Sequence, residues 1–246
     1  MKIEPEILKF LNGETFQTSL TISLSKTKHD NISREAVITD MVRGTKVIHI
    51  GCSDHIQVIN EKIKTNTWLH KLLTDNSEKC IGIDIDKESI DYIKKELGYK
   101  NVFRGDITSD HFADIKSDKW DYAVFGELIE HLDNPVNFLK SFKEKYGENV
   151  TRFIITVPGI YNRRQFRNMF NYKEVINSDH RFWFTPYTIS KVVTSAGYIP
   201  EKITYANLVS LSVPELITRK LRQLIGIKVK YPFYYFNTII ISGRIN

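Results

Sequence analysis

The amino-acid sequence predicts an α/β fold in which a doubly wound, mostly parallel sheet is wrapped by helices. The first indication is that the middle of the chain alternates short apolar runs with segments of helical periodicity. The second is the length of 246 residues, which suits one large domain, or one domain with a small cap. The third is the composition: 41% hydrophobic and 26% charged residues are typical of a globular protein and exclude disorder, collagen and coiled coil.

Apolar runs and helical segments follow one another in a regular order. The runs predict strands over Thr45–Gly51, Cys80–Ile85, Asn101–Ile107, Trp120–Phe125 and Arg152–Val157. The periodic segments predict helices over Asp54–Leu73 and Lys87–Leu97, one near Glu127, and one over Pro135–Tyr146 that begins with proline, where no N–H is needed. Later in the chain, Pro186–Ala196 predicts a helix ended by Gly197, and Ile199–Leu208 and Asn237–Gly243 predict two more strands.

Three segments lie outside this alternation. Residues 1–42 are predicted to form an N-terminal helical cover, and residues 43–246 form the main domain. Within it, residues 160–185 are basic and aromatic without a clear period, which predicts a long connection or a small cap. Residues 215–230 are amphipathic and basic, which is typical of a helix covering a sheet edge and is also compatible with a membrane surface or a dimer face. We expect any homodimer contact to lie within residues 215–236.

The charge and the cysteine content exclude several classes of protein. The 35 Lys and Arg against 29 Asp and Glu give a net charge of +6, a mild preference for anionic partners that is too small to indicate nucleic-acid binding by itself. Two cysteines, Cys52 and Cys80, form neither a disulfide framework nor a thiolate zinc cluster. The first ten residues carry charges where a signal peptide is apolar, and no apolar run approaches the ~20 residues of a membrane span. We therefore expect a cytoplasmic protein without a transmembrane segment.

Residues suited to cofactor binding follow four of the predicted strands. They are the tight turn Gly51-Cys52-Ser53, the pair Asp84-Ile85, the pair Asp106-Ile107, and Gly126. Small residues in the first turn let the backbone approach a ligand, and an acidic residue after the second strand is placed to accept hydrogen bonds from ribose hydroxyls. Asp106 would accept from an adenine amino group or, alternatively, cap a turn. No G-x-G-x-x-G follows the first strand, which argues against a dinucleotide-binding domain.

The order and spacing of these motifs resemble the class I S-adenosylmethionine-dependent methyltransferases over about residues 43–243. The resemblance implies a Rossmann-like sheet of seven strands with an antiparallel last strand. It also implies that S-adenosylmethionine is lined by Gly51, Cys52, Ser53, Asp84, Ile85, Asp106, Ile107 and Gly126. One departure concerns the methionine end, because the family usually has an acidic residue two positions before the first glycine, where this chain has His49.

The segment Gly126 to Leu132 carries three residues that could ligate a metal. In a helix, Glu127, Glu130 and His131 would stand at i, i+3 and i+4 on one face. This E-x-x-E-H pattern, followed by Asp179-His180-Arg181-Phe182, resembles the small-RNA 2′-O-methyltransferases, and its first part also resembles the ubiquinone-pathway O-methyltransferases. The first resemblance implies a Mg or Mn ion held by Glu127, Glu130, His131 and His180. The alternative is a metal-free site in which His131 acts as a general base or packs locally.

The acceptor side is predicted from residues 161–167, which follow the fifth strand. Tyr161, Arg163, Arg164 and Arg167 suit a phosphate or diphosphate, since guanidinium groups bind such oxygens in a fork, although a solvated loop would look the same. We therefore expect an O-methyltransferase that acts on a small hydroxylated anionic acceptor, best a nucleotide-linked sugar or other intermediate of surface-polysaccharide synthesis. Glu130 and His131, or a metal they hold, would deprotonate the hydroxyl.

Three other functions fit the same residues. An RNA 2′-O-methyltransferase is supported by the metal-site pattern and a pI near 9.1, but the chain lacks a separate RNA-binding domain and its charge is modest for a protein that neutralises many phosphates. Methylation of a phosphate or phosphoramidate oxygen is a related small-molecule reaction. A non-catalytic module that binds the cofactor without turnover has the unusual His49 turn as its support.

Overall fold

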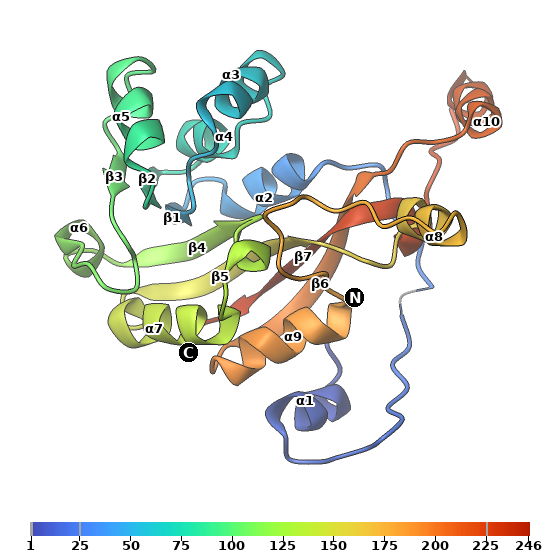
Figure 1. Ribbon diagram of the computed structural model, residues 1–246, viewed down its shortest axis with the longest axis horizontal. Coiled ribbons are helices and arrows are strands. Elements are labelled where there is room, and N and C mark those ends of the chain that lie inside the picture. Colours follow the sequence, from blue (N-terminus) through green and yellow to red (C-terminus); the bar gives the residue numbers. More distant parts are fainter. Residues whose placement is uncertain (1, 25, 225) are drawn as a thin grey trace.

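The computed structural model describes residues 2–24, 26–224 and 226–246. Its centre is a seven-stranded sheet in the order β3-β2-β1-β4-β5-β7-β6, shown in Figure 1. The strands are β1 (Lys46–Ile50), β2 (Lys79–Asp84), β3 (Val102–Arg104), β4 (Trp120–Gly126), β5 (Val150–Pro158), β6 (Ile199–Leu208) and β7 (Phe236–Arg244). The first five run parallel, and β7 pairs antiparallel with both β5 and β6. The sheet predicted from the sequence is confirmed, including its antiparallel last strand.

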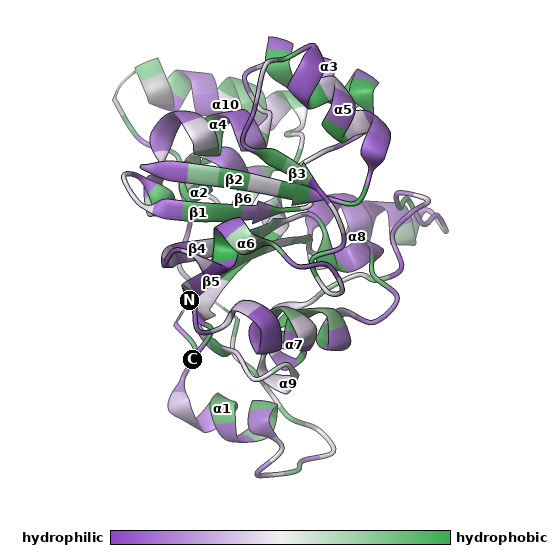
Figure 2. Ribbon diagram, turned by 90° about the vertical axis from the view of Figure 1, so that its left-hand side faces the viewer, coloured by the Kyte–Doolittle hydropathy of each residue, from purple (hydrophilic) through white to green (hydrophobic). Residues whose placement is uncertain are grey.

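Helices cover both faces of the sheet, as Figures 1 and 2 show. On one face α2 (Arg34–Val42) and α4 (Leu69–Asn76) pack on the central strands, and α3 (Ile56–Lys64) packs with α5 (Lys87–Lys95) over β3. On the other face α7 (Pro135–Tyr146) and α9 (Pro186–Ser195) enclose the largest apolar core. This burial of apolar surface on both sides of parallel strands is what stabilises the doubly wound arrangement.

The N-terminal residues include two helices, as predicted. α1 (Pro5–Asn12) lies against α9, where the ammonium group of Lys191 donates hydrogen bonds to the carbonyls of Phe10 and Leu11 at 3.0 and 2.7 Å. α2 begins after Ser33, whose hydroxyl accepts from the N–H of Ala36 and so caps the helix. α1 therefore packs on α9, which itself covers the sheet, whereas α2 packs directly on the sheet.

The predicted helix over Asp54–Leu73 is wrong, because the structure has two helices there. Asn66 adopts a left-handed conformation with φ of 53°, and the N–H of Thr67 donates to the carbonyl of Lys62. A left-handed residue ends the helical hydrogen-bond ladder, so α3 stops at Lys64 and α4 starts in a new direction at Leu69. The apolar period continues across the break because both helices bury a face.

Four smaller differences concern the other elements. The third strand is shorter than predicted, and α6 (Ala113–Lys116) was missed. The connection 160–185 contains α8 (Arg163–Phe170), whose first turn is capped by the Asn162 side chain. None of the residues of α8 is buried, so its apolar side chains face solvent and not the core. α10 (Val213–Leu224) overlaps the predicted amphipathic region 215–230 and begins two residues before it.

Among the described residues, no helix is both long enough and apolar enough to cross a membrane.

Candidate active site at the carboxyl edge of the sheet

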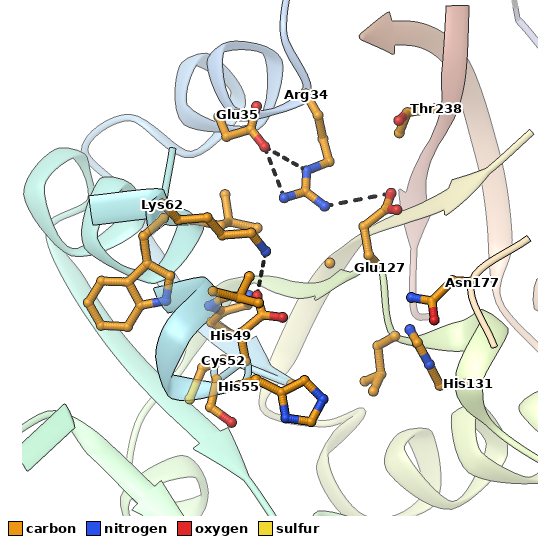
Figure 3. Close-up of a pocket in the computed structure, with 18 of the residues that line it drawn as sticks. Arg34, Glu35, His49, Cys52, His55, Lys62, Glu127, His131, Asn177 and Thr238 are labelled. Carbon is orange, nitrogen blue, oxygen red and sulfur yellow. Dashed lines mark hydrogen bonds and ion pairs between the residues drawn. The ribbon is translucent and has the colours of Figure 1, made fainter. Parts of the chain in front are cut away.

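The main candidate site is a pocket of about 620 Å³ where β1, β2 and β4 end. Carboxyl ends of parallel strands are where doubly wound folds bind ligands, because the connections that follow diverge there. Figure 3 shows the pocket with side chains that reach it from α2, from the turns after β1 and β4, and from the start of β7. Most of the residues predicted for the cofactor and the metal line it: Gly51, Cys52, Ser53, Asp84, Gly126, Glu127, His131 and His180.

The turn after β1 forms a cradle held by the end of β2. Gly51 has a left-handed φ of 71°, and a Cβ on it would come within 3.2 Å of Leu128. The N–H groups of Gly51 and Cys52 donate to the carbonyl of Ile83 at 2.9 and 3.3 Å. The N–H of Ser53 donates to the Asp84 carboxylate at 3.0 Å. The turn is therefore fixed with backbone exposed to the pocket, while Cys52 is buried and burial raises the pKa of its thiol well above the ordinary value.

Asp84 lies between two loops and binds both. One carboxylate oxygen accepts from Ser53 and the other from the N–H of Asp86 at 3.0 Å. Each oxygen keeps a further lone pair, so the side chain can also accept from a ligand hydroxyl in the pocket. The next residue, Ile85, is 70% exposed and presents an apolar surface beside this carboxylate.

The end of β4 also has no room for a side chain at Gly126, because a Cβ there would come within 2.8 Å of the Leu69 side chain. The predicted pair Asp106-Ile107 lies outside the pocket lining. The Asp106 carboxylate accepts from the N–H and the hydroxyl of Thr108 at 2.8 and 2.7 Å, and Ile107 is buried. In this structure Asp106 stabilises its own turn.

The predicted helix at Glu127 is wrong, and the i, i+3, i+4 arrangement does not form. Glu127 has a left-handed φ of 56°, and its N–H donates to the carbonyl and the hydroxyl of Thr156 at 3.1 and 3.0 Å. These bonds hold Glu127 at the end of β4, so the following turn is a short 3₁₀ helix over Ile129–His131. Glu127 consequently lies outside the group of potential ligand atoms that Glu130 and His131 form with His180.

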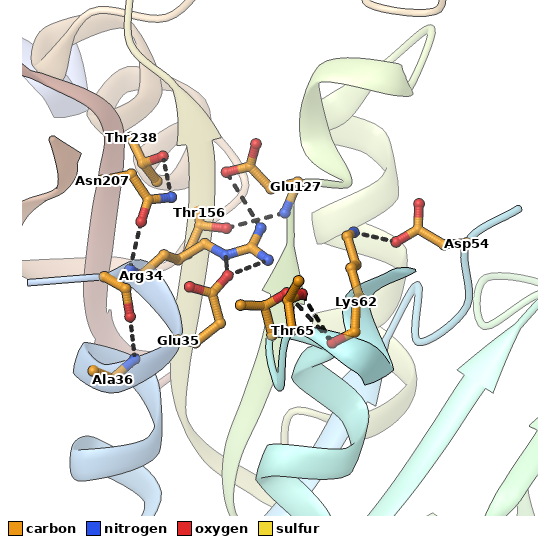
Figure 4. Close-up of polar contacts among 12 residues, drawn as sticks. Arg34, Glu35, Ala36, Asp54, Lys62, Thr65, Glu127, Thr156, Asn207 and Thr238 are labelled. Atoms are coloured by element: carbon orange, nitrogen blue, oxygen red, sulfur yellow. Dashed lines mark hydrogen bonds and ion pairs between the residues drawn. The ribbon is translucent and has the colours of Figure 1, made fainter. Parts of the chain in front are cut away.

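Glu127 meets Arg34 instead, as Figures 3 and 4 show. The guanidinium of Arg34 lies 3.6 Å from the Glu127 carboxylate and 2.9 Å from that of Glu35. The backbone N–H of Arg34 donates to the Asn207 side chain at 2.9 Å, which fixes the start of α2 to the end of β6. Sequence reasoning missed Arg34, because nothing local distinguishes this buried arginine from the exposed ones.

Glu130, His131 and His180 come together across a chain separation of about fifty residues. One potential ligand atom from each lies within 4.8 Å of the others, and the two imidazole rings have centroids 4.6 Å apart. Arg181 accounts for this meeting: its N–H donates to the Glu130 carbonyl at 2.8 Å, and its guanidinium binds the His131 carbonyl and the Asp133 carboxylate. Three of the four predicted metal ligands are therefore brought together, whereas Glu127 is paired with Arg34.

The electrostatics of this cluster fit a cation. Glu130 is fully buried, and neither carboxylate oxygen has a hydrogen-bond partner among the described residues. Burial, and then the charge of Glu127, raise the pKa of Glu130 far above its usual range. Burial and the neighbouring His131 lower the pKa of His180, which keeps its imidazole neutral and able to ligate. A divalent cation would satisfy the unpartnered carboxylate and both imidazoles at once.

The predicted acceptor residues lie elsewhere on this side of the protein. Arg163 forms an ion pair with Glu215 and stacks on Tyr235 at 4.6 Å, while Arg164 and Arg167 are exposed. Tyr161 lines a neighbouring hollow near residues 13–24. The same connection contributes Asn177, Asp179 and His180 to the pocket, so it reaches the site through its later residues.

Other lining residues were not predicted: His55 and Lys62 near α3, and Asn207, Asn237 and Thr238 at the ends of β6 and β7. Lys62 is held by an ion pair with Asp54. His49, which replaces the usual acidic residue, is buried under the pocket, and neither ring nitrogen has a partner among the described residues. Burial lowers the pKa of His49 well below the ordinary value, so the floor of the pocket is uncharged there.

Comparisons with known proteins show the family and the fold of the chain. The methyltransferase-domain family matches residues 29–202 of the chain. The small RNA methyltransferase HEN1 superposes with a TM-score of 0.56 at 13% identity, over 92% of this chain and 27% of that one. A SAM-dependent methyltransferase from Thermotoga maritima superposes with a TM-score of 0.55 at 15% identity, over 87% and 88% of the two chains. A comparison with curated proteins gave no match. On the family match and the fold, the chain belongs to the class I S-adenosylmethionine-dependent methyltransferases.

Proposed function

We propose that the protein is an O-methyltransferase that transfers the methyl group of S-adenosylmethionine to a hydroxyl of a small anionic acceptor, with the help of a Mg or Mn ion. The observation that carries this proposal is the convergence of Glu130, His131 and His180 at the edge of the pocket. As an acceptor we favour a nucleotide-linked sugar or a related intermediate of surface-polysaccharide synthesis, because the connection that brings His180 to the pocket also carries the basic and aromatic residues 161–167.

The cofactor would occupy the turn after β1. Gly51, Cys52 and Ser53 offer backbone atoms there, Asp84 would accept from the ribose hydroxyls, and Ile85 would cover the base. Gly126 leaves room beside the sulfur, and Asp106 with Ile107 would close the adenine end if the local turn opened. S-adenosylmethionine supplies an electrophilic methyl group, so the protein has to bring the acceptor oxygen into line with it.

The second requirement is removal of the hydroxyl proton. A divalent cation held by Glu130, His131 and His180 would lower the pKa of the hydroxyl that it binds. In the metal-free alternative, His131 lies in the pocket wall and takes the proton itself. Glu127 lies outside this cluster and faces Arg34 at 3.6 Å.

Labelled methyl transfer to a panel of nucleotide-linked sugars, with Mn²⁺ and then with excess chelator, tests the proposal. We expect label in the sugar pool that chelator removes, and at least tenfold less label with His180→Ala. His111→Ala, a change of an exposed histidine outside the pocket, is the matched control and should leave transfer unchanged. Binding of Mn²⁺ measured by paramagnetic resonance gives a readout independent of turnover. Full activity of His180→Ala in excess chelator would contradict the metal site.

A second candidate is RNA 2′-O-methylation. It is favoured by the meeting of His180 with Glu130 and His131, because this is the ligand pattern that the sequence shares with the small-RNA enzymes. In a parallel reaction, label in the 3′-terminal ribose of a short RNA, with binding that weakens steeply as salt rises, would select it. Label in neither pool would direct the search to acceptors methylated on a phosphate or phosphoramidate oxygen, or to a protein that binds the cofactor without turnover.

A further inference from the structure

Two segments at one end of the molecule hold the net positive charge of the chain. They are residues 163–173, which contain α8, and residues 213–230, which contain α10; together we call them the basic face. Of the 35 Lys and Arg residues nine lie in the basic face, and of the 29 acidic residues only Glu215 does. The rest of the chain therefore has 26 basic against 28 acidic residues and is close to neutral. Such segregation indicates an anionic partner for this face.

The same two segments expose large apolar side chains. On α10 the residues Val213, Ile217, Leu221 and Leu224 recur at helical spacing, and Leu224 is 82% exposed. On α8 the exposed residues are Phe166, Met169 and Phe170, followed by Tyr172 at 99%. Exposed apolar side chains grouped on two neighbouring helices are typical of a surface that binds a partner.

The structure joins α8 and α10 and places them at the pocket side of the sheet. Glu215 in the first turn of α10 binds Arg163 in the first turn of α8, and Arg163 stacks on Tyr235. Figure 1 shows both helices on the same side of the molecule, beyond the strand ends. The chain that follows each helix reaches the pocket, at Asn177 after α8 and at Asn237 in β7 after α10.

We propose that the basic face docks the protein on an anionic membrane surface, with the apolar residues of α8 and α10 inserted at the level of the headgroups. An amphipathic helix with exposed leucines and flanking lysines and arginines binds lipid in two ways. Its leucines are buried among the lipids, and its charges are attracted to anionic headgroups. The pocket then opens toward the bilayer side, where a lipid-borne acceptor would be presented. The proposal concerns binding and does not depend on which hydroxyl is methylated.

Two other occupants explain the face less well. A nucleic acid would use the arginines and aromatic rings, but the aliphatic stripe of α10 offers nothing for bases to stack on. A second copy of the chain would place the same face against itself in a two-fold dimer, which brings two strongly positive surfaces together. An anionic lipid surface satisfies the charges and the leucines at once.

Sedimentation of the full chain with vesicles tests the proposal. We expect binding to equal mixtures of phosphatidylcholine and phosphatidylglycerol, no binding to phosphatidylcholine alone, and weaker binding as salt rises. Arg219→Ser with Arg222→Ser should weaken binding about 30-fold, at about one tenfold step for each 1.4 kcal/mol and roughly 1 kcal/mol for each charge near the surface. Leu221→Glu with Leu224→Glu should abolish it.

Matched controls separate docking from general effects. Lys64→Ser with Lys100→Ser removes two exposed charges elsewhere, and Phe16→Glu changes an exposed apolar residue elsewhere; both should bind as the unchanged protein does. Equal binding to neutral vesicles, equal loss in the controls, or no vesicle binding would each overturn the proposal. So would tight binding to short RNA that the leucine changes leave intact, or a dimer in sedimentation velocity that Leu221→Glu dissociates in place of vesicle binding.

Discussion

His70 of α4 allows a quantitative test of how tightly the helices pack on the sheet. The side chain is fully buried and lies parallel to the ring of His49, with 5.6 Å between centroids. The rings of Trp68 and Tyr99 also pack against the His70 ring, with centroid distances of 5.6 and 6.0 Å. Burial lowers the pKa of His70 from 6.5 to about 4, because the charged form would lose its water.

The sign and the size of the effect follow from this shift. As the pH falls below 6.5 the unfolded chain takes up a proton at His70, whereas the folded protein does so only near pH 4. The contribution of neutral His70 to stability is therefore present above pH 6.5 and is lost as the pH falls toward 4. At about 1.4 kcal/mol per pH unit, the loss in free energy of unfolding is roughly 3 kcal/mol.

His70→Gln removes this titration. Urea unfolding followed by circular dichroism, from neutral pH to about pH 4, should show the variant less stable at neutral pH, with the difference from the unchanged protein shrinking by roughly 3 kcal/mol at the acid end. His111→Gln, at an exposed position, should keep a constant difference. A difference for His70→Gln that does not change with pH would refute the burial argument.

Three further predictions concern the pocket and the core. Gly82→Ala places a Cβ 2.6 Å from His70 and 2.7 Å from the thiol of Cys52, so the urea midpoint should fall by the equivalent of about 1–3 kcal/mol, and an unchanged midpoint would mean that the core has room. Phe142→Ala leaves a cavity at a fully buried site and should lower the free energy of unfolding by about 3–5 kcal/mol in the same assay. A decrease of less than about 1 kcal/mol would contradict this prediction. Asp84→Asn should weaken binding of S-adenosylhomocysteine about tenfold in calorimetry with little change in melting temperature; equal affinity would remove Asp84 from the cofactor site.

The sequence by itself determined the strands, most of the helices and the class of fold. The buried strands contain short apolar runs, such as Val47-Ile48 in β1 and Phe153-Ile154-Ile155 in β5, so each strand can be recognised from a few neighbouring residues. The turn at Gly51 and the acidic end of β2 at Asp84 are likewise local patterns, and both line the pocket. Local patterns fail where a single residue changes the backbone direction, as Asn66 does between α3 and α4.

Only the tertiary structure decided which side chains meet. Glu127 and Glu130 are three residues apart, yet the N–H of Glu127 donates to Thr156 and the Glu127 side chain faces Arg34, whereas Glu130 meets His131 and His180. His180 lies beside them because the next residue, Arg181, hydrogen-bonds to the turn after β4. The connection that carries both residues shows no regular hydrophobic pattern in the sequence. Such contacts depend on where the sheet places distant segments, and the free energy that fixes them comes from burial of the whole core, so no local sequence pattern carries them.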